Sequence, residues 1–154
     1  MQNLKLVGVL CPHQEARRLI ESLRAIFGRV GVGMRMLEED GDGGPDPDLV
    51  IALGGDGTVL RALERHPHTP TLAINFGHVG FLTAGGQSEA EKLIFRLLAD
   101  DYYIEERVLL VSEFKGQRRE VINEVVVKGA TKMVAVDLFV DGGLIHCIRG
   151  DGAI

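Results

Sequence analysis

The chain has 154 residues and a mass of 16.8 kDa, the size of one domain or of one domain with part of a second. It carries 17 Lys and Arg against 22 Asp and Glu, a net charge of −5, so its overall charge points to neither nucleic acid nor an anionic membrane. Apolar residues make up 45% and charged residues 25%, which is typical of a globular protein, and no apolar run approaches the roughly 18–20 residues of a membrane span.

The N-terminus and the cysteines favour a cytoplasmic protein. The apolar run 6–10 is followed at once by polar and charged residues, so it is too short for the core of a signal peptide. Cys11 and Cys147 lie far apart and form no CxxC motif, so we expect free thiols. His66 and His68 have no third ligand nearby, and we expect exposed loop residues there rather than a metal site.

The first 98 residues alternate between apolar runs and amphipathic stripes. Short apolar runs predict strands at 4–10, 32–37, 49–53 and 71–74. Apolar residues at helical spacing predict helices at 19–27, 59–66 and 90–98. The last of these follows a capping box from Ser88 to Glu91. The alternation predicts an α/β domain over residues 1–98, with a three-layer, Rossmann-like arrangement around a mostly parallel sheet.

Beyond residue 98 the pattern changes to β-strands without a helical stripe. We expect strands at 102–114, 121–127, 134–140 and 144–148, with turns at 115–117 and 141–143. This predicts an all-β domain over residues 99–154, with free sheet edges and little to cover its faces. We therefore expect an incomplete β domain, either because the chain is a fragment of a longer protein or because another chain completes the sheet.

A glycine-rich motif, Gly54-Gly55-Asp56-Gly57-Thr58, lies between the strand 49–53 and the helix that follows it. Ligands bind at such strand ends in open α/β sheets, and glycines let backbone N–H groups approach phosphate oxygens beside the positive end of a helix. A carboxylate among such groups suggests chemistry, because it can take a proton from an attacking hydroxyl or hold a metal. The alternative is that Asp56 only caps the helix.

The motif resembles the signature shared by NAD kinases, diacylglycerol-type lipid kinases and 6-phosphofructokinases. Three further segments resemble NAD kinases in particular: Asn75 to Thr83 (NFGHVGFLT), Asn123-Glu124 and Gly150-Asp151-Gly152. The four segments stand in the order of that family and cover essentially the whole chain. The resemblance implies Mg²⁺-dependent transfer of phosphate from ATP, or from polyphosphate, to the 2′-hydroxyl of the adenosine ribose of NAD. It also implies a homodimer or homotetramer, and an NAD-binding role for the β domain.

The resemblance further implies a role for individual residues. Asp56 would be the base that faces the 2′-hydroxyl, and Phe81 would lie against the nucleotide. The remaining NAD-binding residues would be Gly57, Asn123, Glu124 and Asp151, and phosphate binding would fall to Gly54, Gly55, Gly57 and Thr58. No residue is assigned as a metal ligand. Two departures stand out: the acid that usually follows Phe-Leu-Thr is Ala84 here, and the chain ends before the Thr/Ser/Gly-rich stretch of the family.

Two other functions stay open at this point. One is a kinase with a lipid or sugar-phosphate acceptor, although the sequence has neither the basic amphipathic helix nor the lipidation signal of a lipid kinase. The other is a nucleotide-binding module without catalysis. Without the resemblance, Phe81 would be read as a core residue, and Asn123 with Glu124 as part of a solvated sheet face or a bulge.

Overall fold

The structure is a computed structural model that describes residues 4–13, 16–37, 44–77, 80–128 and 134–150. The chain divides into two compact units, residues 1–108 and 109–154. Within the described ranges, no helix has the length and apolar character that crossing a bilayer requires. The roles expected for the two parts, phosphate binding in the first and NAD binding in the second, stay predictions.

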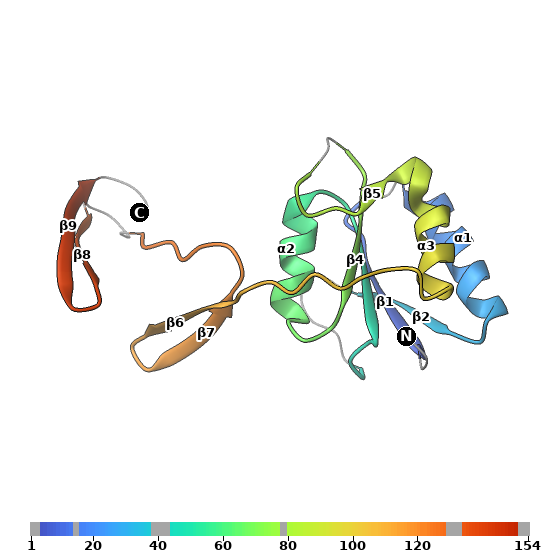
Figure 1. Ribbon diagram of the computed structural model, residues 1–154, viewed down its shortest axis with the longest axis horizontal. Coiled ribbons are helices and arrows are strands. Elements are labelled where there is room, and N and C mark those ends of the chain that lie inside the picture. Colours follow the sequence, from blue (N-terminus) through green and yellow to red (C-terminus); the bar gives the residue numbers. More distant parts are fainter. Residues whose placement is uncertain (1–3, 14–15, 38–43, 78–79, 129–133, 151–154) are drawn as a thin grey trace. The chain divides into compact units, whose positions relative to one another are not determined.

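The first unit is built on a five-stranded parallel sheet (Figure 1). Its strands are β1 (Leu6–Leu10), β2 (Gly33–Leu37), β3 (Leu49–Leu53), β4 (Thr71–Asn75) and β5 (Gly85–Gly86). They lie in the order β2-β1-β3-β4-β5, and each neighbouring pair is parallel. Every residue of β3 is buried, as expected for a strand that is covered on both faces. The sheet confirms the predicted α/β class, and β5 is an addition that the sequence did not predict.

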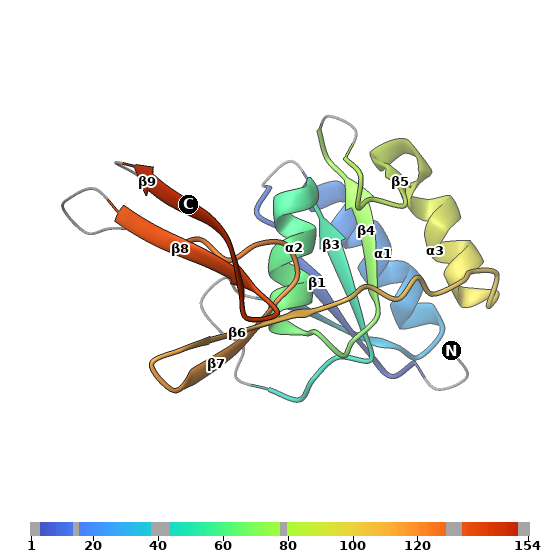
Figure 2. The same ribbon diagram turned by 60° about the vertical axis from the view of Figure 1, so that its left-hand side comes forward.

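Helices cover both faces of this sheet, which confirms the three-layer prediction. Two helices, α1 (Arg17–Arg29) and α3 (Ala90–Leu98), lie on one face, and α2 (Asp56–Arg65) lies on the other (Figures 1 and 2). The larger apolar cluster fills the first interface, where strand residues such as Ile51 meet Leu23, Phe27 and Ile94. The smaller cluster lies under α2.

Two alanines form part of the sheet surface under α2, beside larger residues such as Leu10 and Val50. Ala52 and Ala73 are buried there against Val59 and Ala62 of the helix. Because these side chains are short, the helix can lie close to the sheet with little void between them. This packing fixes the start of α2 directly above the carboxyl end of β3, where the glycine-rich motif lies.

The start of α3 differs from the prediction. A short 3-10 helix, η2 (Gln87–Glu89), precedes α3, and the Glu89 carboxylate accepts a hydrogen bond from the Gly86 N–H at 3.2 Å. The expected capping box between Ser88 and Glu91 is therefore wrong. Glu91 instead accepts a hydrogen bond from the Ser22 hydroxyl at 2.7 Å, which links α3 to α1.

The second unit contains two antiparallel hairpins within the described residues. The first pairs β6 (Leu110–Phe114) with β7 (Gln117–Val121), and the second pairs β8 (Val134–Val140) with β9 (Gly143–Gly150). Both are closed by two residues with positive φ, Lys115-Gly116 and Asp141-Gly142, as in a tight hairpin turn.

The first hairpin corrects two predicted strands. Residues 102–109 are not in a strand, and the return strand β7 ends at Val121, where the sequence pattern placed the beginning of a strand. The physical reason is the turn. Because it has only two residues, it pairs Phe114 with Gln117, so the return strand starts at once and is used up before the apolar run 121–127.

Candidate active site

The candidate site lies where the strand order of the first unit reverses. The chain passes from β1 outward to β2, and then returns to build β3, β4 and β5 on the other side of β1. In open parallel sheets of this order, ligands bind outside the carboxyl ends of the strands at the reversal. The carboxyl ends of β1 and β3 bring Cys11 and Gly54 to this edge, and β4 ends beside them at Asn75.

The glycine-rich motif turns the chain from β3 into α2. The Gly54 N–H donates a hydrogen bond to the Ile74 carbonyl at 3.0 Å, which continues the pairing of β3 with β4. A Cβ at Gly54 would overlap the Thr58 hydroxyl oxygen, and Thr58 itself is 4% exposed. Gly55 and Gly57 are different, since a Cβ at either would meet no atom within 4 Å. Gly54 and Thr58 thus pack against each other, while Gly55 and Gly57 leave open space.

Asp56 is not the N-cap of α2. That position is Gly55, and the helix start has no side-chain cap hydrogen bond. The Asp56 carboxylate instead contacts the segment after β4: Oδ2 accepts a hydrogen bond from the Phe81 N–H at 3.1 Å, and Oδ1 accepts one from the Leu82 N–H at 3.0 Å. The helix-cap interpretation is therefore wrong. In the first turn of α2, the negative charge of Asp56 is also favoured by the helix dipole.

The segment 80–82 presents an aromatic ring to solvent. The Phe81 side chain is 98% exposed, whereas Leu82 packs against the apolar cluster under α2. The interpretation of Phe81 as a core residue is therefore wrong. An exposed ring on a backbone that is hydrogen-bonded to Asp56 is available to contact a ligand. Residues 78 and 79, which precede this segment in the same motif, lie outside the described residues.

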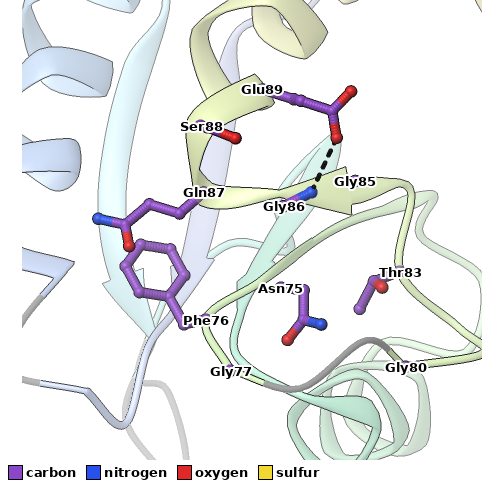
Figure 3. Close-up of a pocket in the computed structure, with 10 residues that line it drawn as sticks. All are labelled: Asn75, Phe76, Gly77, Gly80, Thr83, Gly85, Gly86, Gln87, Ser88 and Glu89. Carbon is purple, nitrogen blue, oxygen red and sulfur yellow. Dashed lines mark hydrogen bonds between the residues drawn. The ribbon is translucent and has the colours of Figure 1, made fainter.

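A cavity of about 770 Å³ opens beside this segment (Figure 3). Its lining comes from the end of β4 and the residues after it (75–77), from Gly80 and Thr83, from β5 and from η2. Phe76 lines it and stacks on the His13 ring with centroids 6.4 Å apart and planes 12° apart, so the end of β1 supports this wall. Glu89 is the acidic residue of the lining, and Ala84 is absent from it. The size suits a nucleotide-sized ligand.

Several titratable residues near the strand ends are not assembled into a metal site. In the described ranges, no three His, Cys, Asp or Glu side chains group closely enough to hold a metal ion. Cys11 and Cys147 are free thiols, as predicted. Burial raises the pKa of the Cys11 thiol, and this thiol donates a hydrogen bond to the His13 carbonyl. His66 differs from the expectation of an exposed loop residue, because its side chain is only 9% exposed and lies 3.7 Å from an Asp46 carboxylate oxygen.

The remaining predicted site residues belong to the second unit. Asn123 and Glu124 follow the end of β7, are exposed, and are joined by a hydrogen bond from the Asn123 amide to the Glu124 carboxylate. The expected strand around them is absent, so they are not a sheet face. Asp151 lies outside the described residues. The role of all three in nucleotide binding stays a prediction. Sequence reasoning missed Gly80 and Leu82, whose contacts with Asp56 join the segment after β4 to the start of α2 and leave no local pattern.

Comparison with known proteins shows a similarity to NAD kinases. Residues 44–102 match the model of the ATP-NAD kinase N-terminal domain. An NAD kinase from Caldicellulosiruptor bescii is 35% identical over 153 residues, which cover 96% of this chain and 59% of that protein. An NAD kinase from Pyrococcus abyssi is 40% identical over 114 residues, which cover 71% of this chain and 41% of that protein. The chain thus spans less than two thirds of the length of these relatives.

Two solved structures share the fold. A yeast NADH kinase complexed with NADH aligns with a TM-score of 0.77 over 99% of this chain and 57% of that chain, and its 19% identity shows a likeness of fold alone. An NAD kinase from Archaeoglobus fulgidus in complex with ATP aligns with a TM-score of 0.67 at 26% identity, over 97% of this chain and 59% of that chain. Together with the matched N-terminal domain and the identity to curated relatives, these findings show that the chain is similar to NAD kinases in sequence and fold.

Proposed function

We propose that this chain carries the phosphoryl-transfer site of an NAD kinase, which moves a phosphoryl group from ATP to the 2′-hydroxyl of the adenosine ribose of NAD and so makes NADP. The observation that carries the proposal is the carboxylate of Asp56, held at the carboxyl end of β3 beside a nucleotide-sized cavity. The family supports the nature of the substrates, since the related structures contain NADH and ATP.

Each part of the site has a chemical task in this reaction. The Asp56 carboxylate takes the proton of the 2′-hydroxyl while the hydroxyl oxygen attacks the γ-phosphorus of ATP. The bond between this phosphorus and the oxygen of the leaving ADP breaks in the same step. The open backbone at Gly55 and Gly57, together with the start of α2, favours the negative charge of the phosphates. Phosphoryl transfer depends mainly on positioning and charge stabilisation, so these groups are part of the catalytic proposal beside the base.

Mg²⁺ is part of the proposal as a partner of the donor. Mg²⁺ usually keeps several waters and is held by substrate phosphates with one or two carboxylates, so it does not require a cage of acidic residues. The described residues fit that mode: Asp56 offers a single carboxylate at the glycine-rich turn, and no group of three or more metal-binding side chains lies among them. When bound with ATP, the ion would neutralise charge on the transferred group.

The acceptor side rests on fewer contacts. Phe81, 98% exposed, offers a ring for the nucleotide, and Asn123 with Glu124 offers polar groups for the adenosine part. Asp151 completes the proposed set. We extend the proposal to polyphosphate as an alternative donor, to a homodimer or homotetramer, and to a cytoplasmic location.

The test is a direct assay of NADP formation. The product of the complete reading frame that contains these residues, and the 154-residue chain beside it, are incubated with NAD, ATP and Mg²⁺. NADP is then measured with an NADP-specific dehydrogenase. Diacylglycerol and fructose 6-phosphate serve as the competing acceptors, with transfer of labelled phosphate as the readout. Transfer to NAD alone supports the proposal, and transfer to either competitor in preference to NAD would refute it.

A further inference from the structure

We infer that Gly80 is a positioning residue for Asp56: having no side chain, it lets the N–H groups of Phe81 and Leu82 close on the carboxylate and fix its orientation for proton removal. The inference deepens the proposed function and rests on it for the reaction itself. We call the two N–H groups and the two carboxylate oxygens that they hold the clamp.

The clamp restrains both oxygens of one carboxylate. Phe81 donates to Oδ2 at 3.1 Å and Leu82 donates to Oδ1 at 3.0 Å. The terminal torsion of an aspartate is otherwise broad, so an unrestrained carboxylate samples a wide range of orientations. With one donor on each oxygen, any large rotation breaks both hydrogen bonds. The clamp therefore selects one plane for the carboxylate.

The clamp leaves the base able to work. An ionised carboxylate has about four lone-pair sites, and the two N–H groups occupy one on each oxygen. One site per oxygen remains for the hydrogen of an incoming hydroxyl. The clamp also has a firm support, since Leu82 packs on the apolar cluster under α2, the helix that begins at Asp56.

Gly80 is required by space. A Cβ built at this position would overlap Oδ1 of Asp56 and would lie 2.9 Å from its Cγ and 3.2 Å from Oδ2. A side chain of any size would therefore push the carboxylate away from the two donors, or push the donors away from the carboxylate. Either movement opens the clamp but leaves the Asp56 carboxylate in the protein. A substitution at Gly80 therefore tests the orientation of the carboxylate without removing it.

The consequence for the reaction is a loss of turnover without a loss of donor binding. General bases act only when the heavy atoms come within hydrogen-bond reach, and a displacement of about 1 Å can cost on the order of 100-fold in rate. We expect Gly80→Ala to lower kcat by about that factor and to leave the KM for ATP nearly unchanged. A role in folding alone would instead lower the amount of active protein and leave kcat per folded molecule intact.

The experiment compares Gly80→Ala with Gly28→Ala. Gly28 lies in α1, and a Cβ there meets no atom within 4 Å, so this control adds the same methyl group away from the site. The first readout is the amide proton shifts of Phe81 and Leu82 during an acid titration. In the parent and in Gly28→Ala, both shifts should move together as the carboxylate takes up a proton. In Gly80→Ala, neither should change with that protonation. The second readout is kcat and KM.

Two outcomes would overturn the inference: an intact amide titration in Gly80→Ala, or an unchanged kcat once that titration is lost. Should Gly80→Ala fail to fold, replacing Leu82 by its α-hydroxy acid analogue removes one N–H donor without adding an atom, and a fall in kcat is again expected. A parent protein that forms no NADP would refute the proposed function, whereas the amide titration would still decide whether Gly80 closes the clamp.

Discussion

Asp56→Asn separates the chemistry of the carboxylate from its role in holding the neighbouring loop. An asparagine side chain has one oxygen acceptor and one NH₂ donor. It can therefore accept from only one of the two N–H groups, of Phe81 or of Leu82, and the other then faces an NH₂. A hydrogen bond to a charged group contributes about 1.5–3 kcal/mol, and solvent around this partly buried site reduces it, so we expect a loss of about 1 kcal/mol in unfolding free energy.

A loss of that size is too small to explain a large fall in activity. For a chain of this length, 1 kcal/mol lowers Tm by about 2–4 °C. A domain with a stability of about 5 kcal/mol would still be more than about 99% folded after losing it. Loss of the general base, by contrast, should lower kcat by about 10²–10⁴-fold.

Asp48→Asn is the matched control for this experiment. Asp48 also accepts two backbone N–H groups, from Lys5 at 2.8 Å and Leu6 at 2.9 Å, but it lies at the amino ends of the strands, at the opposite edge of the sheet. The Asp48→Asn variant should have a lower unfolding free energy than the parent and an unchanged kcat. Melting curves and kcat are measured for both variants. Near-normal turnover in Asp56→Asn, or a fall in turnover that follows the folded fraction, would refute the assignment of Asp56 as the base.

Three further predictions concern acid stability, the glycine turn and the acceptor. Two backbone N–H groups lower the pKa of Asp48 in the folded protein. The ionised carboxylate therefore contributes its full stabilisation of the folded state above the unfolded pKa of about 3.9, and this contribution is lost as the pH falls through the lower folded pKa. Urea unfolding at pH 5 and pH 3 should show a smaller change in unfolding free energy for Asp48→Asn than for the parent. Gly54→Ala should lower the unfolding free energy by about 1–3 kcal/mol, because its Cβ would overlap the buried Thr58 hydroxyl, and an unchanged Tm would contradict that packing. Asn123→Ala should raise the KM for NAD more than the KM for ATP, and equal changes in steady-state assays would count against a contact with the acceptor.

The sequence predicted the elements whose signals are local. The strand 49–53 was predicted to the residue, because an apolar run is bounded by Asp48 and Gly54, and α2 ends before Pro67 as expected. The hairpin β8–β9 was predicted for the same reason, from alternation around Asp141-Gly142. Where the apolar pattern continued past a tight turn, as at 121–127, the pattern alone placed the strand wrongly, since the turn fixes the register.

The candidate site was only half accessible to sequence reasoning. The glycine-rich turn could be placed at a strand end because strand, turn and helix follow one another along the chain. The partners of Asp56 could not be found in this way, since Phe81 and Leu82 lie 25 and 26 residues further on and meet it only after β4 has paired with β3. Likewise, β5 has two glycines and no side-chain pattern, so only its pairing with β4 identifies it as a strand.

The small residues under α2 have a consequence for how this fold can change over evolution. Ala52 and Ala73 set the height of the helix above the sheet, and Asp56 is the first residue of that helix. A larger residue at either position would lift or tilt α2 and so carry the carboxylate away from the N–H groups that hold it, although no residue of the site had been altered. Substitutions at Ala52 and Ala73 are therefore constrained by the position of the Asp56 carboxylate as well as by packing under α2. In a redesigned sheet, residues 54–58 would have to be transferred together with 80–82 and with the small residues beneath the helix.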